Sequence, residues 1–293
     1  MRISIIGAGR LGGALALALA KKKIQIENLA ARNFETVEKI AKFIEPPPKI
    51  LAANDFSEIT SDVILITTQD SEIESVANEL AAKLKTKPTV FHTSGSLSSE
   101  ILKDLRTVGC SVGSIHPLVS ISDAQLGAER FANAYFCVEG DEAAIETAEK
   151  IVERLGGKSF FIAAEYKTLY HASAVTACGH LVALTDAAIE MLTKCGLKNN
   201  EAQTVLLPLI KSTVENLETQ ATAQALTGTF ARADAGTLEK HIKILRENVS
   251  PEALEIYLQL GARSLNLAEQ QNANSENIEK MRGQILLAKK NLK

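Results

Sequence analysis

A glycine-rich motif near the amino end has the clearest chemical meaning in this chain. It directly follows an apolar run that ends at Ile6, and it consists of Gly7, Ala8, Gly9, Arg10, Leu11 and Gly12. In such a G-x-G-x-x-G motif the first glycine allows a sharp turn, the second lets the backbone approach a pyrophosphate, and the third lets a helix pack closely on the strand. The phosphates lie at the helix N-terminus, where free N–H groups and the helix dipole favour an anion. The motif therefore predicts a dinucleotide site.

The end of the second apolar run should decide which dinucleotide binds. A carboxylate at this point would hold a ribose 2′-hydroxyl, whereas an arginine would hold a 2′-phosphate. Arg32 and Asn33 follow the run, with no Asp or Glu directly after it. Because a planar guanidinium pairs well with phosphate oxygens, we expect NADP rather than NAD. The alternative is that Glu27, at the start of the same run, binds the ribose and favours NAD.

Further polar residues stand where later strands are expected to end. They are Thr67, Thr68, Gln69, Ser94 and His116. Ligands of open α/β sheets bind outside the carboxyl ends of the parallel strands. We therefore expect these side chains to line one cleft, with the first three near the nucleotide.

Two basic residues further along the chain could act as a general acid or base. Lys167 and His171 are spaced i, i+4, which places them on one face of a helix. Lys167 could protonate a developing alkoxide or amine, and a site of low polarity would lower its pKa toward the useful range. His171 and His116 could orient the substrate or relay the proton. The alternatives are that the helix pair is a solvated face and that His116 belongs to a rigid His-Pro turn.

The elements that position these residues form an α/β pattern, because short apolar runs alternate with helical periodicity. Strands are expected at 1–6, 27–31, 49–52, 62–68, 89–92, 111–115, 135–138 and 159–162. Helices are expected at 34–44, 142–155, 165–195, 201–220, 235–246, 251–271 and 275–292. The 293 residues, 46% of them hydrophobic, suffice for two domains. We predict a doubly wound, mostly parallel Rossmann-type sheet in residues 1–164 and an all-helical substrate or dimerisation domain in residues 165–293.

Composition and charge narrow the range of partners. The net charge is −3 and no large basic block is present, which argues against nucleic acid or an anionic membrane surface. The four cysteines form no C-x-x-C pair and no metal-binding spacing with the five histidines. We therefore expect reduced thiols, no metal and a cytoplasmic protein. We also expect no signal peptide and no apolar run long enough to span a bilayer.

Together these motifs resemble those of a family of Rossmann-like proteins classed as NADP oxidoreductases that carry a C-terminal domain of unknown function. The resemblance covers nearly the whole chain and rests on the 7–12 motif, His92-Thr93-Ser94-Gly95, His116-Pro117-Leu118, Lys167, Tyr170-His171-Ala172, Leu226-Thr227-Gly228 and Arg232-Ala233-Asp234. The family is similar to pyrroline-5-carboxylate reductases, deazaflavin-dependent NADP reductases and β-hydroxyacid dehydrogenases. The resemblance implies a helical C-terminal domain that forms a homodimer.

Individual positions match these relatives to different degrees. Lys167 matches the catalytic Lys of β-hydroxyacid dehydrogenases, but His171 stands where they have Asn. Ser94 and His116 resemble, in placement, the Ser and the His-Pro that meet the substrate in prephenate dehydrogenases. The second-domain motif of the relatives usually has Pro and Gly where this chain has Thr229 and Ala233. These departures leave the substrate class open.

The sequence thus predicts an NADP-dependent oxidoreductase that transfers a hydride between NADP(H) and a small polar substrate, which could be a hydroxy acid, a carbonyl compound or an imine. Lys167, His171, His116 and Ser94 are the candidate catalytic residues. A prephenate-like dehydrogenase is one alternative, although few arginines are available for a dicarboxylate. A non-catalytic NADP-binding sensor is another.

Overall fold

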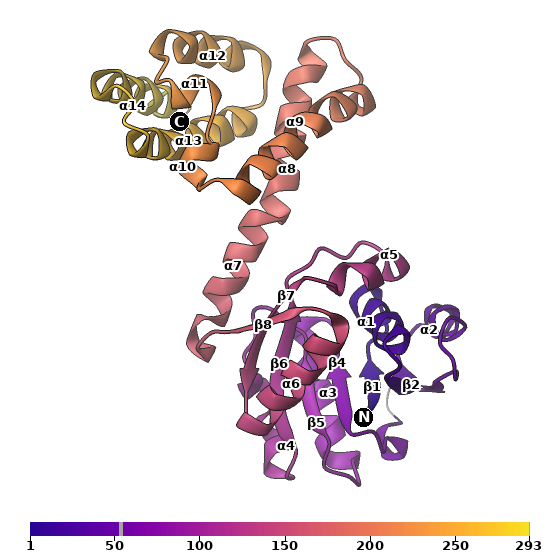
Figure 1. Cartoon of the computed structure of the whole chain (residues 1–293). Helices are drawn as coiled ribbons and strands as arrows, with labels where there is room; N and C mark the ends of the chain where they lie inside the picture. The colour runs from indigo at the N-terminus through magenta and orange to yellow at the C-terminus, as the bar shows by residue number, and fades with distance from the viewer. Residues whose placement is uncertain (53–54, 293) are drawn as a thin grey trace. The chain divides into compact units, whose positions relative to one another are not determined.

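The computed structural model describes residues 1–52 and 55–292 of the chain. The chain folds into two compact units, Met1–Thr176 and Ala177–Lys293, which are described separately below (Figure 1). The division expected from the sequence lies between residues 164 and 165. The first unit extends further because the first residues of the long helical segment pack on the sheet, where Lys167 is buried against Ser114.

An eight-stranded sheet forms the centre of the first unit, in the order β3-β2-β1-β4-β5-β6-β7-β8. The strands are β1 (Arg2–Ile6), β2 (Gln25–Ala30), β3 (Lys49–Leu51), β4 (Val63–Ile66), β5 (Thr89–His92), β6 (Ser111–Pro117), β7 (Tyr135–Gly140) and β8 (Lys158–Phe161). All neighbouring pairs are parallel except β6 with β7. The predicted doubly wound, mostly parallel sheet is thereby confirmed.

Helices cover both faces of this sheet, because alternate strand residues point to opposite sides. On one side Ile5 and Leu65 pack with α1 (Arg10–Lys21), α2 (Phe34–Ala41), α5 (Ala124–Ala128) and α6 (Glu142–Leu155). On the other side Ile64 and Ile66 pack with α3 (Asp70–Lys83) and α4 (Lys103–Thr107). Two apolar layers therefore hold the strand ends in fixed positions.

The order of the strands reverses direction between β1 and β4. The chain runs outward from β1 through β2 and β3 on one side, and returns to pair β4 with β1 on the other. At such a point the loops after the two strands diverge and leave a crevice at their carboxyl ends. The glycine motif follows β1, and Thr67 follows β4, so both lie at this crevice.

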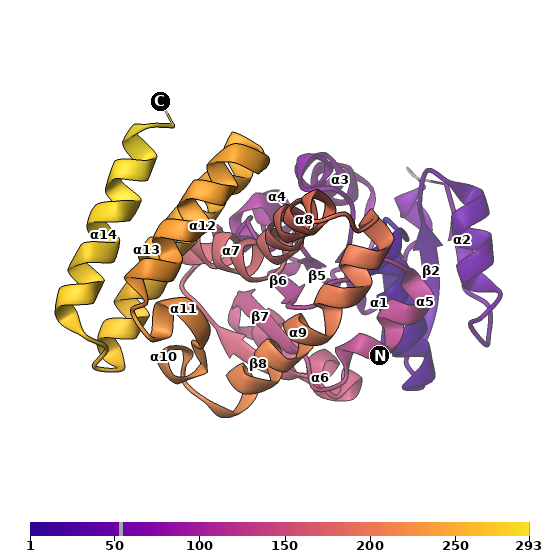
Figure 2. The ribbon, with the colours of Figure 1, turned by 90° about the horizontal axis from the view of Figure 1, so that it is seen from above.

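The second unit is helical. It contains α8 (Gly179–Lys194), α9 (Asn199–Thr219), α10 (Thr222–Ala225), α11 (Gly228–Ala231), α12 (Ala235–Asn248), α13 (Pro251–Gln270) and α14 (Ser275–Lys290). Figure 2 shows α12, α13 and α14 side by side. Leu238, Leu258 and Met281 come from these three helices and meet in one buried cluster. The predicted helical domain is confirmed. The homodimer expected to form through it stays a prediction.

The turn before α12 contains the departure from the family motif noted above. Asp234 caps α12, since its carboxylate accepts hydrogen bonds from the Thr237 backbone N–H at 2.9 Å and from the Thr237 hydroxyl at 2.7 Å. Ala233 has a φ of +49°. This left-handed conformation favours glycine, so the tight turn is retained here with a less favourable residue.

The single helix predicted for residues 165–195 is interrupted. It is divided into α7 (Lys167–Ala177) and α8, with the break at Cys178 just before Gly179. Glycine has the lowest helix propensity apart from proline. By length and composition alone, the helical stretch Ala164–Lys194 could cross a membrane, because it has 31 residues and contains an 18-residue window with a mean hydropathy of 1.4. The expectation that no apolar run is long enough was therefore wrong.

Candidate functional site

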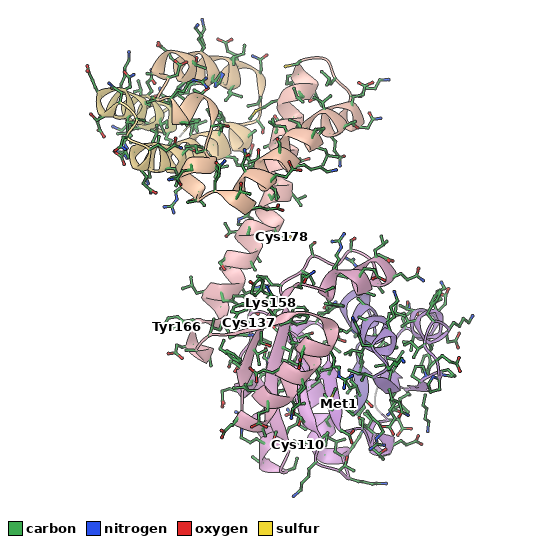
Figure 3. All side chains as sticks on the ribbon, in the orientation of Figure 1. Met1, Cys110, Cys137, Lys158, Tyr166 and Cys178 are labelled. Carbon is green, nitrogen blue, oxygen red and sulfur yellow. The ribbon has the colours of Figure 1, made fainter. Side chains whose placement is uncertain are left out.

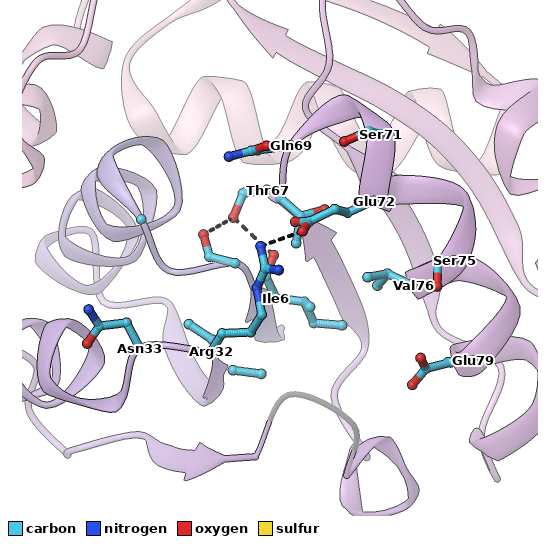
Figure 4. Close-up of a pocket in the computed structure, with 15 residues that line it drawn as sticks. Ile6, Arg32, Asn33, Thr67, Gln69, Ser71, Glu72, Ser75, Val76 and Glu79 are labelled. Carbon is cyan, nitrogen blue, oxygen red and sulfur yellow. Dashed lines mark hydrogen bonds and ion pairs between the residues drawn. The ribbon is translucent and has the colours of Figure 1, made fainter.

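A pocket of about 500 Å³ lies where β1, β2 and β4 end and α3 begins (Figure 4). Seven of the predicted nucleotide-binding residues line it: Gly7, Gly9, Arg32, Asn33, Thr67, Thr68 and Gln69. They come from three loops that are distant in sequence, and the parallel strands bring these loops to one edge of the sheet. The crevice expected from the strand order is therefore present and open.

The glycines of the motif have distinct steric roles. A Cβ atom at Gly7 would lie 2.7 Å from the Thr68 backbone nitrogen, and Gly7 itself has a φ of +99°. A Cβ atom at Gly12 would lie 2.6 Å from the Gly7 carbonyl oxygen. By contrast, the nearest atom to a Cβ at Gly9 would be 3.8 Å away. Gly7 and Gly12 are thus required by the protein's own packing, whereas the space beside Gly9 is free for a ligand.

Some predicted cofactor residues do not line the pocket. Ala8 is buried, Leu11 packs against the apolar core, Gly12 contacts Thr67, and Arg10 is exposed at the start of α1. Asn33 does line the pocket, but its side-chain oxygen also accepts a hydrogen bond of 3.2 Å from the Thr36 N–H and so caps α2. These residues shape the loop, and a direct contact with nucleotide stays a prediction.

Arg32 enters the pocket from the end of β2 and forms an ion pair with Glu72 of α3. Glu27, the alternative ribose ligand, does not line this pocket. Its carboxylate binds Arg2 at 3.1 Å and the Thr60 hydroxyl at 2.8 Å. Glu27 is therefore not placed to hold a ribose there.

The residues present fit a dinucleotide. The Thr68 hydroxyl oxygen is buried in the pocket wall and has no hydrogen-bond partner within the protein. Buried polar groups are ordinarily satisfied, so an orphaned hydroxyl beside the open space at Gly9 is suited to a polar ligand. Among residues 1–52 and 55–292, no group of three or more His, Cys, Asp or Glu side chains could hold a metal ion.

A second set of polar side chains gathers at the ends of β5 and β6, and it includes the buried Lys167 of α7. Only 1% of Lys167 is exposed, and its Nζ donates a hydrogen bond of 2.8 Å to the Ser114 hydroxyl. Burial lowers the pKa of Lys167, and nearby Cys137 (labelled in Figure 3), Glu139 and Asp70 oppose this shift. A lysine in these surroundings gives up its proton more readily than one in water.

Two histidines and a tyrosine stand next to this lysine. His116 Nδ1 and the Tyr170 hydroxyl are 2.6 Å apart, and the rings of His116 and His171 meet edge to face at 5.9 Å. Burial, followed by the charges of Lys167 and His171, lowers the pKa of His116 to about 4. Burial also raises the pKa of Tyr170. At neutral pH the pair therefore consists of a neutral imidazole and a protonated phenol.

Gly95 leaves room for this arrangement. A Cβ atom at Gly95 would lie 2.6 Å from His171 Cδ2 and 2.8 Å from His116 Nε2. The loop after β5 thus passes directly beneath both imidazoles. The structure brings Lys167, His171 and His116 together, as the sequence suggested, and their catalytic roles stay predictions.

Ser94, the fourth candidate, has hydrogen-bond partners in its own loop and at the start of α3. Its hydroxyl donates to Asp70 at 2.9 Å and accepts the backbone N–H groups of Ser96 and Leu97, each at 3.1 Å. The Ser96 hydroxyl donates to the same Asp70 carboxylate at 2.7 Å. Ser94 therefore orders the loop beneath the histidines, and its contact with a substrate stays a prediction.

His92 lies below this loop and is completely buried. Its Nδ1 accepts the Ser94 backbone N–H at 3.2 Å, and its Nε2 has no partner. Burial, assisted by the charge of Lys167, lowers the pKa of His92 to about 4. A neutral histidine thus supports the loop from the interior.

Sequence reasoning missed Ser114, Asp70 and Glu72. Ser114 stands two residues before His116 on β6, so the period of two along a strand could have placed both side chains on one face. Asp70 directly follows Gln69, which lines the nucleotide pocket. Asp70 itself binds Ser94 and Ser96, so these two neighbouring residues connect the pocket with the second set of side chains. No sequence signal marked Glu72, because its pairing with Arg32 depends on how β2 and α3 are arranged.

Comparisons with known proteins agree with this architecture. A family model described as a Rossmann-like domain matches residues 1–117, and one described as a domain of unknown function, DUF2520, matches residues 134–264. No curated protein matches the chain.

Several solved structures share the fold. A Bacteroides fragilis protein provisionally classed as an NADP oxidoreductase is 22% identical with a TM-score of 0.73, and the match covers 90% of this chain and 98% of that one. The Thermotoga maritima protein TM1727 is 27% identical with the same TM-score, over 92% and 99% of the two chains. Pyrroline carboxylate reductase from Plasmodium falciparum, solved with NADP bound, is 15% identical with a TM-score of 0.57, over 92% and 98%. The part of the chain that matches the Rossmann-like model thus precedes the part that matches the DUF2520 model, and the fold is one that these solved structures share.

Proposed function

We propose that this protein is an NADP-dependent oxidoreductase that transfers a hydride between NADP(H) and a small polar substrate with a C–O or C–N bond at the reacting carbon. The observation that carries the proposal is the buried Lys167 amine beside the His116–Tyr170 pair, at the same edge of the sheet as the glycine pocket. The names of the similar B. fragilis and P. falciparum proteins support NADP as the cofactor.

The pocket residues divide the binding of the cofactor among them. The backbone at Gly9 is open to the pyrophosphate, the Thr68 hydroxyl offers an unused hydrogen bond, and the Arg32 guanidinium suits a 2′-phosphate. When bound, the nicotinamide ring supplies or accepts the hydride, which is chemistry that protein side chains do not provide. The chain's own residues then have to position the substrate and to donate or accept one proton.

Lys167 is the residue we assign to that proton. In the reducing direction, negative charge develops on the substrate oxygen or nitrogen as the carbon gains a hydride. A lysine ammonium whose pKa is lowered by burial donates a proton to this atom more readily than an exposed one. The Ser114 hydroxyl, at 2.8 Å, fixes the position of the amine.

The His116–Tyr170 pair offers a second hydrogen-bond donor. Because its pKa is raised, the Tyr170 hydroxyl keeps its proton and donates it to His116 Nδ1. His116 Nε2 then carries a hydrogen and lies directly over the backbone of Gly95. We assign this Nε2–H to orienting the substrate, with His171 as its neighbour.

The test is turnover by Lys167→Met with NADPH on a panel of carbonyl compounds, imines and, in reverse, hydroxy acids. Methionine keeps the length and packing of the side chain but has no proton to donate. We expect kcat to fall about 1000-fold, which is typical for loss of a general acid, and the NADPH Kd to change by less than about 3-fold. Lys150→Met, which removes an exposed lysine of α6, is the matched control.

Two results would contradict the proposal. Equal turnover by Lys167→Met and native protein would remove Lys167 from the mechanism. Tight NADPH binding with no turnover of any panel member by the native protein would favour a non-catalytic sensor, because a sensor needs the nucleotide pocket but no proton donor. A prephenate-like dehydrogenase, the alternative enzyme, would be recognised by turnover of prephenate when this dicarboxylate is added to the panel.

A further inference from the structure

The ion pair between Arg32 and Glu72 occupies the part of the pocket where a 2′-phosphate would be recognised. Arg32 extends from the end of β2, and Glu72 comes from the first turn of α3, across the pocket (Figure 4). The Arg32 side chain is 74% exposed, whereas the Glu72 side chain is only 29% exposed. The carboxylate is thus the more fixed partner, and the guanidinium is the one that can move.

The charges around this pair oppose a phosphate. Among the described residues that line the pocket, Arg32 is the only cationic side chain, while Glu72 and Glu79 are both carboxylates. A phosphate monoester carries about −1.5 to −2 charges at neutral pH. A bound 2′-phosphate must therefore share Arg32 with Glu72 or displace it, in a pocket whose described charged side chains sum to a negative value.

We propose that Glu72 is a specificity-determining residue that limits the preference of this pocket for NADP over NAD. It does so by holding Arg32 and by repelling the 2′-phosphate, whereas a ribose without that phosphate leaves the ion pair intact. The proposal rests on the proposed function, because it requires that the pocket bind a nicotinamide dinucleotide. It means that cofactor choice is set by two residues, one of which lies outside the β2 loop.

Glu79 provides a matched comparison for Glu72. Both are carboxylates of α3 that line the same pocket, but Glu79 is paired with Lys83 at 3.7 Å and not with Arg32. A general effect of negative charge on nucleotide binding would be shared by the two residues. An effect that depends on competition for Arg32 belongs to Glu72 alone.

The experiment measures the Kd of NADPH and of NADH for native protein, Glu72→Gln and Glu79→Gln by reduced-nicotinamide fluorescence. Glutamine keeps the size of the side chain and removes its charge. For Glu72→Gln we expect NADPH to bind about 5- to 10-fold more tightly, with NADH changed by less than about 2-fold. For Glu79→Gln we expect the ratio of the two Kd values to stay as in the native protein. Unchanged thermal unfolding checks that each variant is folded.

Three results would overturn the proposal. In the first, Glu72→Gln changes both Kd values by the same factor. In the second, Glu79→Gln alters the NADPH to NADH ratio as much as Glu72→Gln does. In the third, Glu72→Gln weakens NADH and spares NADPH, which would mean that the carboxylate holds a ribose hydroxyl. If native protein binds neither nucleotide, the proposed function fails as well; NADPH binding with an unaltered ratio in Glu72→Gln removes this proposal alone.

Discussion

The nucleotide pocket and the buried lysine cluster lie at the same edge of one sheet, yet they are built in different ways. The pocket is formed by backbone that comes close together, and on its open side a Cβ at Gly9 would have no neighbouring atom nearer than 3.8 Å. The lysine cluster is formed by side chains whose hydrogen bonds join residues 53 and 54 positions apart, Lys167 with Ser114 and Tyr170 with His116.

The two regions differ in how much their polar groups lower the stability of the folded protein. An open pocket costs little wherever its polar groups face solvent until a ligand arrives, although the Thr68 hydroxyl in its wall is buried without a partner. Buried basic side chains are costly, because burial disfavours their charged forms. Perturbed pKa values of this kind gather at functional sites, and here they gather at His92, His116 and Lys167. We therefore expect the lysine cluster to determine how far the stability of the protein falls in acid, and the pocket to determine its affinity for the nucleotide.

The largest effect is expected for stability in acid. The pKa of His92 is about 4 in the folded protein, compared with 6.5 for a free histidine. Because the unfolded chain binds the proton more readily, stability is fully present above pH 6.5 and is lost as the pH falls from there to about 4. This loss is about 3 kcal/mol for His92 alone. Urea unfolding of His92→Asn at several pH values should show a correspondingly smaller loss than the native protein.

Phe91→Leu serves as the control for this measurement, because it perturbs a buried neighbour without a titrating group. It should lower stability equally at all pH values. The account of the cluster would be contradicted if His92→Asn and native protein lost the same free energy of unfolding between pH 7 and pH 4.

A smaller effect, on affinity alone, is expected for Gly9→Ala. The added methyl has room within the protein but lies where the pyrophosphate must approach. We expect NADPH binding to weaken about 100-fold, or about 2.7 kcal/mol, with little change in Tm. Gly283→Ala, in α14, adds a methyl that meets nothing within 4 Å and should leave binding unchanged. Normal NADPH affinity in Gly9→Ala would show that the glycine pocket does not hold the pyrophosphate.

The two regions also differ in how far the sequence could predict them. The glycine motif is contiguous and follows a strand, so its site could be derived from local rules, and Thr67 and Arg32 followed from the ends of neighbouring strands. Lys167 and His171 were placed on one helix face by their spacing. Ser114 and Glu72 were not predicted, because their partners are set by tertiary packing between distant elements. The helix break at Cys178 was not predicted either, because a single glycine such as Gly179 is tolerated in many helices.

The most direct test of the central claim is a fluorescence titration of native protein and Arg32→Ala with NADPH and with NADH. We predict that the native protein binds NADPH more tightly than NADH, and that Arg32→Ala loses about 10-fold in NADPH affinity, with NADH affected by less than about 2-fold. Equal or tighter binding of NADH by the native protein would contradict the choice of NADP. If the native protein bound neither nucleotide, the proposal that it is an oxidoreductase would be contradicted.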